Sequence, residues 1–152
     1  MTSVKSIPDG YHTVAPYLLV QGADKLIKKA FDAKETDCYS VPDGSVGHAE
    51  IRLGDSVIML SEAMGEEYKP MTAGIHLYVE NCDATYQRAL NAGATSTMQP
   101  ADQFYGDRSA GVRDPFGNQW WIATHKEDLS KEEITKRMDD HMKKQAQGQG
   151  QK

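Results

Sequence analysis

The sequence predicts an α+β fold made of two tandem βαβββ modules and a C-terminal helix. Two observations carry this prediction: an internal repeat, and the order of strand-like and helix-like patterns within each copy. A shift of 59 residues aligns residues 15–36 with residues 74–95 without a gap, and six of the 22 aligned pairs are identical. Residues 49–52 likewise match residues 110–113. Two copies of one module are therefore the economical interpretation.

The first module is expected over residues 11–62. Residues 14–20 are rich in Val, Leu and Tyr, which favours a strand, and apolar side chains at helical spacing predict a helix over about residues 23–33. Turn residues then separate three further short strands, expected over residues 37–41, 46–53 and 56–61.

The second module is expected over residues 73–125, after a linker over residues 62–72. Its first strand is predicted over residues 74–79, and its helix over about residues 82–92, ended by Gly93. The remaining strands are predicted near residues 95–99, 108–113 and 119–125.

The two ends of the chain differ from the modules. Residues 1–10 are expected to be flexible. Ser130 and Glu133 form a capping box, and apolar residues recur every fourth position from Ile134, so a surface helix is predicted within residues 126–144. Residues 145–152 have no apolar side chain larger than that of Ala146 and are expected to be a disordered tail.

Composition excludes several classes of function. Seventeen Lys and Arg against 22 Asp and Glu give a net charge of -5, so nucleic acid is a poor default partner. The apolar runs are too short to span a bilayer, and no apolar region follows Lys5, so we expect no membrane association and no export. The two cysteines, Cys38 and Cys82, form no CxxC pair, which suits a cytoplasmic location.

Two stretches carry a resemblance to a known family. They are residues 47–60, from Gly47-His48-Ala49-Glu50 onward, and residues 102–118, which contain Tyr105-Gly106-Asp107-Arg108 and Arg113-Asp114-Pro115-Phe116-Gly117. With the paired modules, they resemble the vicinal oxygen chelate superfamily, and within it the PhnB-like branch of the glyoxalase and bleomycin-resistance proteins. The resemblance implies a single domain over residues 11–125, whose two modules form a cupped mixed sheet, and a homodimer.

The resemblance also implies where a metal would bind. Metal-dependent members take ligands from the first and last strands of each module. The matching first-strand positions here are Ala15 and Gly74, and the matching last-strand positions are Ile58 or Met59 and Trp121. None offers an oxygen or imidazole ligand for a hard divalent cation, so we expect no metal at the usual positions.

Strand alternation predicts which side chains line the cup. Residues two apart share a face of a strand, so the apolar positions of the first strands face the helices and their neighbours face the cup. Apolar walls with a few polar groups are typical of small-molecule pockets. With Tyr105 expected on a loop over the cup, the candidate ligand-binding residues are Tyr17, His48, Glu50, Arg52, His76, Tyr78, Tyr105, Arg113 and Trp121.

Three of these residues support other interpretations. His48, Glu50 and His76 would suit an unorthodox site for a divalent metal, as in a metal-dependent lyase or dioxygenase, or could do acid–base work. The alternative is that Glu50 pairs with an arginine and the histidines bond locally. The leading hypothesis is a small-molecule-binding protein. The metal-dependent enzyme is the second hypothesis, and a structural or partner-binding role for the C-terminal helix is the third.

Overall fold

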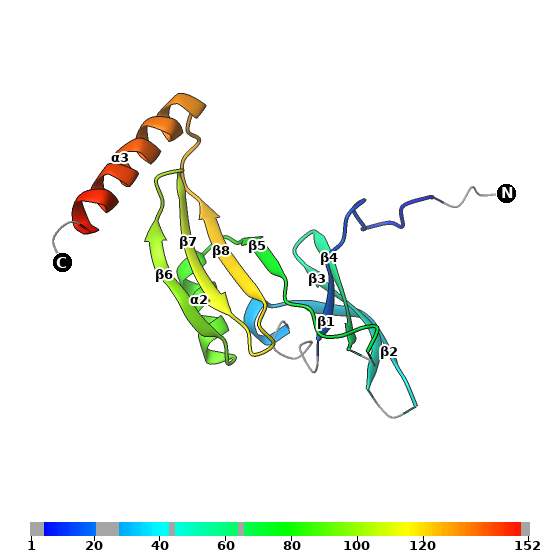
Figure 1. Cartoon of the computed structure of the whole chain (residues 1–152). Helices are drawn as coiled ribbons and strands as arrows, with labels where there is room; N and C mark the ends of the chain where they lie inside the picture. Colours follow the sequence, from blue (N-terminus) through cyan, green and yellow to red (C-terminus); the bar gives the residue numbers. More distant parts are fainter. Residues whose placement is uncertain (1–4, 21–27, 43–44, 64–65, 150–152) are drawn as a thin grey trace.

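The chain folds into two four-stranded mixed sheets in the computed structural model, which describes residues 5–20, 28–42, 45–63 and 66–149. The first sheet has the strand order β1-β4-β3-β2 and the second the order β5-β8-β7-β6 (Figure 1). In each sheet the first strand of the module runs parallel to the last, and the other pairs are antiparallel. The predicted α+β fold of tandem modules is confirmed. The strands are β1 (Tyr17–Val20), β2 (Lys34–Ser40), β3 (Val46–Leu53), β4 (Ser56–Glu62), β5 (Gly74–Tyr78), β6 (Thr95–Asp102), β7 (Asp107–Arg113) and β8 (Gln119–His125).

The pairing of first and last strands is equivalent in the two modules. Tyr17 of β1 lies opposite Met59 of β4, and His76 of β5 lies opposite Trp121 of β8. The 59-residue shift maps Tyr17 onto His76, so the repeat in the sequence is also a repeat in register.

Some strand ends differ from the prediction. β1 starts at Tyr17 rather than at residue 14: Val14 is 82% exposed, and Pro16 contributes only its carbonyl, which accepts from the amide of Met59 at 2.9 Å. β2 starts at Lys34 rather than residue 37, and β6 continues to Asp102 through Pro100. Pro100 is tolerated there because β6 is an edge strand, where a missing N–H leaves no partner unsatisfied.

Helix α2 (Cys82–Asn91) covers the convex face of the second sheet (Figure 1). The side chain of Asn81 caps it by accepting from the amide of Ala84 at 3.0 Å, and Gly93 follows with a φ of 111°. In the first module, residues 28–31 are helical, whereas residues 21–27 of the expected helix lie outside the described part of the chain.

One continuous apolar core joins the two modules. Leu18, Ile51 and Leu60 from the first sheet belong to the same cluster as Trp120 and Ile122 from the second. The link is the ring of Phe31, whose centroid lies 4.5 Å from that of Trp120. Packing of a first-module helix residue on a second-module strand therefore sets how the two sheets sit together.

Helix α3 (Lys131–Gln149) projects away from the sheets (Figure 1). Ser130 accepts from the amide of Glu133 at 3.2 Å, which is the N-cap half of the predicted capping box, while the carboxylate of Glu133 accepts from Arg137. The predicted C-terminal helix is confirmed, but it continues to Gln149 and so includes residues 145–149, which were expected to be disordered. Gln and Ala are good helix formers, and the lack of apolar residues does not stop a helix that is already nucleated. No helix among the described residues has the length and apolar character needed to cross a membrane.

Candidate functional site

A cluster of polar and aromatic side chains lies on the open face of the first sheet. Tyr17 Oη lies 3.2 Å from Nδ1 of His48, and Nε2 of His48 lies 3.3 Å from Oε1 of Glu50. An ionised carboxylate only accepts, so the tautomer of a neutral His48 ring that fits these contacts carries its proton on Nε2 and accepts from Tyr17 at Nδ1. The result is a directed chain from Tyr17 through His48 to Glu50.

The N-terminal segment crosses this cluster. Tyr11 donates its hydroxyl hydrogen to Oε2 of Glu50, and Nη1 of Arg52 donates to the carbonyl of Gly10 at 3.1 Å. The bond to Glu50 raises the pKa of Tyr11. Gly10 has a φ of 82°, and a Cβ there would lie 2.8 Å from Nη2 of Arg52. Flexibility was predicted for residues 1–10; residues 1–4 lie outside the described part, but Gly10 is bound to the sheet. We name Gly10, Tyr11, Tyr17, His48, Glu50 and Arg52 the first-module cluster.

A second group of side chains lies on the open face of the other sheet. The carboxylate of Asp107 is buried, accepts from Tyr78 Oη at 3.0 Å, and lies 2.7 Å from Nδ1 of His125. These bonds raise the pKa of Tyr78 and, together with a bond to Asp128, that of His125. The ring of His76 lies 4.7 Å from that of Tyr78. We name His76, Tyr78, Asp107, Trp121 and His125 the second-module cluster.

The Tyr105-Gly106-Asp107-Arg108 motif singled out in the sequence braces the loops of the second module. Arg108 binds Asp83 through two nitrogens, at 2.6 and 2.8 Å, and Asp102 through a third at 3.2 Å; these bonds raise the pKa of Arg108 and lower that of Asp83. Tyr105 Oη lies 3.4 Å from Oγ of Ser109, so its ring is tied to β7. The geometry therefore favours a structural role for Asp107 and Arg108, whose side chains are held by local hydrogen bonds and ion pairs.

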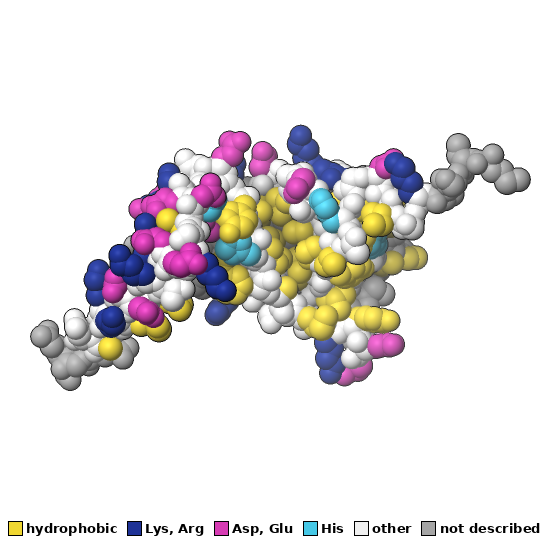
Figure 2. Space-filling model, turned by 90° about the horizontal axis from the view of Figure 1, so that it is seen from above, with side chains coloured by type: hydrophobic (Ala, Val, Ile, Leu, Met, Phe, Trp, Pro, Cys, Tyr) yellow, Lys and Arg dark blue, Asp and Glu magenta, His cyan; other side chains and the backbone are white. Residues whose placement is uncertain are grey.

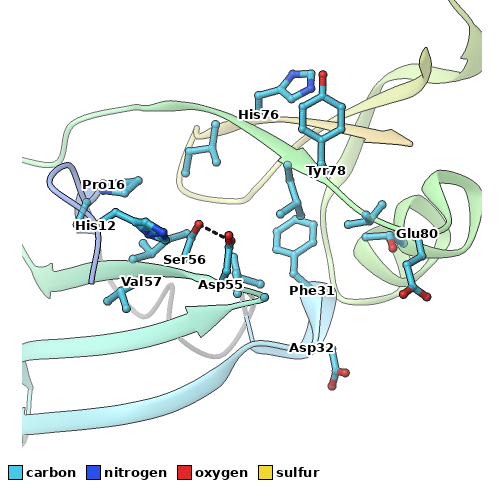
Figure 3. Close-up of a pocket in the computed structure, with 18 of the residues that line it drawn as sticks. His12, Pro16, Phe31, Asp32, Asp55, Ser56, Val57, His76, Tyr78 and Glu80 are labelled. Atoms are coloured by element: carbon cyan, nitrogen blue, oxygen red, sulfur yellow. Dashed lines mark hydrogen bonds between the residues drawn. The ribbon is translucent and has the colours of Figure 1, made fainter. Parts of the chain in front are cut away.

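A cavity lies at the junction of the modules and not on the cup face alone. It has a volume of about 900 Å³ and extends from the N-terminal segment and the β3–β4 turn to β5 and the start of α2. Figure 3 shows His12 and Pro16 on one side, His76 and Tyr78 on the other, and the ring of Phe31 directed towards β5. We call this cavity the junction pocket.

The free edge of β5 lines the junction pocket. The carbonyl of Ala73 accepts from Gln119, and the amide of Val79 donates to Ala123, so alternate residues of this strand are bonded to β8. The intervening residues, His76 and Tyr78 among them, direct their backbone N–H and C=O groups to the opposite edge. No described strand pairs with that edge. The pocket therefore offers backbone hydrogen-bonding groups as well as apolar walls, which include Phe31, Leu53, Val57, Ile75, Leu77 and Val79.

The predicted site residues lie in different parts of the structure. His76 and Tyr78 line the junction pocket. Tyr17, His48, Glu50 and Arg52 lie together in the first-module cluster, whereas Trp121 lies beside His76 and is 44% exposed. Arg113 is exposed at the end of β7, opposite Gln119. Figure 2 shows hydrophobic side chains across the middle of one face, with histidines on either side.

The residues at the usual metal positions do not fit a hard divalent cation. Ala15 and Gly74 offer no donor atom, and Ile58 is 3% exposed and belongs to the core. Met59 and Trp121 occupy the equivalent cup-facing positions, and neither supplies oxygen or imidazole nitrogen.

The unorthodox metal site is not assembled either. Within the described part of the chain, no group of three or more His, Cys, Asp or Glu residues is placed to hold a metal ion. His48 and Glu50 belong to the first sheet and His76 to the second, and both oxygens of Glu50 already have partners in Tyr11 and His48. Among the described residues, a single chain therefore gives no support to the alternative that His48, Glu50 and His76 form one metal site.

Three residues with site contacts were missed in the sequence. Tyr11 meets Glu50 from 39 positions away, and no local spacing announces such a contact. His125 could have been found, because it shares a strand face with Trp121 by alternation. Asp107 was recognised only as part of a loop motif. Its burial depends on how β7 packs against the loop before α3, and local sequence does not report that packing.

Comparisons with known proteins agree on the fold. The model of the Glyoxalase/Bleomycin resistance protein/Dioxygenase superfamily matches residues 26–122. Uncharacterized protein Mb0911c of Mycobacterium bovis is 37% identical over 134 residues, covering 80% of this chain and 88% of that protein. The crystal structure of TioX from Micromonospora sp. ML1 has a TM-score of 0.64 at 21% identity, covering 75% of this chain and 98% of TioX. A PhnB protein from Bacillus cereus has a TM-score of 0.61 at 14% identity, covering 74% and 99%.

Proposed function

Because the chain belongs to the Glyoxalase/Bleomycin resistance protein/Dioxygenase superfamily, we propose that it is a small-molecule-binding protein that works without a metal at the family's usual positions. The observation that carries the proposal is the junction pocket. Its volume of about 900 Å³ falls at the upper end of the roughly 300–1,000 Å³ that small-molecule sites occupy.

The lining of the junction pocket supports an organic ligand. Phe31 and Leu77 give it apolar walls, and the carboxylates of Asp32, Asp55 and Glu80 stand at its rim with the guanidinium of Arg88. Apolar contact supplies affinity in such a site, and a few polar groups fix orientation. His76 and Tyr78 connect the pocket to the open face of the second sheet, where Trp121 offers an aromatic surface.

The hydroxyl groups of Tyr17 and Tyr78 already donate to other residues of the protein, which supports ligand binding rather than a nucleophilic reaction. Tyr78 donates to Asp107, and Tyr17 donates to His48 in the tautomer derived above. Each phenolic oxygen therefore offers lone pairs to a bound molecule. A ligand with an N–H or O–H donor near an aromatic group could donate a hydrogen bond to the phenolic oxygen of either cluster.

A pair of substitutions on α2 tests this proposal. Ala84 lines the junction pocket, whereas Gln87 lies one turn further along the same helix, is exposed, and does not line it. We expect Ala84→Phe to fill the pocket and Gln87→Phe to leave it open. Calorimetric titration with a set of aromatic amines should show binding to the wild type and to Gln87→Phe, and at least tenfold weaker binding to Ala84→Phe. Equal binding to all three proteins would place the ligand elsewhere and contradict the proposal.

We also propose a homodimer located in the cytoplasm. The resemblance to the family suggests the dimer, and exposed aromatic side chains on the cup face, such as Tyr17, Tyr78 and Trp121, supply apolar surface for contact with a second copy. Cys38 is a free, exposed thiol, which suits a reducing compartment. Light scattering during gel filtration would give the mass of one chain if the dimer proposal is wrong.

A further inference from the structure

A segment of the chain itself occupies the polar part of the first-module cluster. Tyr11 donates a phenolic hydrogen to Glu50, and Gly10 presents a backbone carbonyl to Arg52 at 3.1 Å. Glu50 and Arg52 are two positions apart on β3, so both side chains stand on one face, roughly 7 Å apart along the strand. The Gly10–Tyr11 unit thus shows which groups this site accepts: a phenol beside the carboxylate and a carbonyl beside the guanidinium.

The site is built around this pair of groups. The Glu50 side chain is only 13% exposed, and its other oxygen is engaged by His48 at 3.3 Å. A partly buried carboxylate needs its hydrogen-bond donors, because losing one leaves a charge without compensation. Gly10 also suits its place, since its φ of 82° strains any residue with a Cβ, and a Cβ there would displace the Arg52 guanidinium that the carbonyl of Gly10 accepts from.

The N-terminal segment that covers the first-module cluster can also be displaced. Residues 5–10 are exposed, and the ion pair of Lys5 with Asp9, at 2.6 Å, joins two side chains that are 71% and 85% exposed. Surface ion pairs contribute little stability, so the segment is held mainly by the bonds of Tyr11 to Glu50 and of Gly10 to Arg52. A ligand that supplies the same donor and acceptor would replace those bonds, and the segment could then open without leaving Glu50 uncompensated. Opening would expose Glu50 and Arg52 beside the rings of Tyr17 and Tyr39, whose centroids lie 5.8 and 6.4 Å from that of His48.

We propose that the first-module cluster binds a phenolic compound that carries a carbonyl group, and that Gly10 and Tyr11 take its place in the free protein. The ligand's hydroxyl donates to Glu50, its carbonyl accepts from Arg52, and its ring lies against Tyr17 and Tyr39. This inference rests on the proposed function and names the ligand class for a site separate from the junction pocket.

The test uses N-acetyl-L-tyrosinamide, which carries both groups, and N-acetyl-L-phenylalaninamide, which lacks the hydroxyl. Tyr11→Phe removes the internal phenol from Glu50. Because a hydrogen bond to a charged group is involved, we expect the tyrosine amide to bind this variant about tenfold more tightly than the wild type. Tyr86→Phe is the control, since it removes a hydroxyl that donates to Ser96 on the other module. Calorimetry gives affinity, and the ring signals of His48 in NMR spectra report the place of binding.

Gly10→Ala provides a second way to displace the segment and should also tighten binding of the tyrosine amide. Adding Glu50→Gln to Tyr11→Phe should abolish the preference for the phenol. Equal binding of the two amides, or no gain in either displaced variant, would overturn the inference. If aromatic amines still bound the junction pocket in that case, the proposed function would stand alone; if they did not, both proposals would fall.

Discussion

Asp114 is expected to hold the second module together, and Asp114→Ala tests this directly. Its carboxylate is buried and accepts four hydrogen bonds: from the amides of Phe116 (3.0 Å) and Asn118 (2.9 Å), from the Asn118 side chain (2.8 Å) and from the indole of Trp120 (3.1 Å). Asn118 in turn accepts from the amide of Ala73, directly before β5, at 2.9 Å. The loop therefore fixes β5 beside β8, and with it His76.

The magnitude follows from the donors left behind. Asn118 and Trp120 are 0% exposed, so three of the four donors would remain buried without a partner in Asp114→Ala. Each such group costs about 1–3 kcal/mol, and partial relaxation brings the total to about 4 kcal/mol. For a chain of this size, the melting temperature should fall by about 8–16 °C.

Urea unfolding and calorimetry measure both quantities. The matched control is Asp55→Ala, in the β3–β4 turn of the first module, where the carboxylate accepts from Ser56 and is exposed. This control should change the free energy of unfolding by less than about 0.5 kcal/mol. An Asp114→Ala protein within about 1 kcal/mol of the wild type would refute the reasoning.

Three further predictions concern burial and titration. The pKa of His125 is raised by Asp107, so its stabilising contribution is complete below the ordinary pKa of 6.5 and is lost as pH rises through the raised value; His125→Gln should therefore lower the free energy of unfolding more at about pH 5.5 than at about pH 9, and an equal loss at both would contradict this. Phe31→Ala removes the ring packed on Trp120 and should cost about 3–4 kcal/mol in urea unfolding, whereas a loss under about 1 kcal/mol would show that the junction is not a shared core. Burial raises the pKa of the Cys82 thiol, so a thiol reagent should modify Cys38 in the folded protein and Cys82 only after unfolding; rapid modification of both would be inconsistent with the burial of Cys82.

Alternation and turn chemistry were enough to predict much of the fold. β3 and β8 begin and end where predicted, because turn residues precede both strands, and in β3 the buried Ala49, Ile51 and Leu53 also alternate with polar residues. The start of β1 was mispredicted, since the apolar Val14 lies beside the junction pocket instead of in the sheet. Local pattern reports which side chains are apolar but not which neighbouring surface receives them.

The candidate site, like the fold, could be predicted only in part. Strand alternation correctly placed Tyr17, His48 and Glu50 on one face, because that depends only on the period of a strand. The separation of His76 from them, and the junction pocket itself, depend on how Phe31 packs between the modules. Contacts of this kind join residues far apart in the chain, and no spacing in the sequence announces them.

The central claim is that the junction pocket binds a small organic molecule. Chemical-shift mapping on the full-length chain, titrated with a set of aromatic amines, tests it most directly. We expect the largest shifts of the backbone amides in residues 75–79, along and just after β5, with further shifts at Phe31 and at the start of α2. Shifts confined to α3 or to the convex surface, or no saturable shifts with any compound, would contradict it.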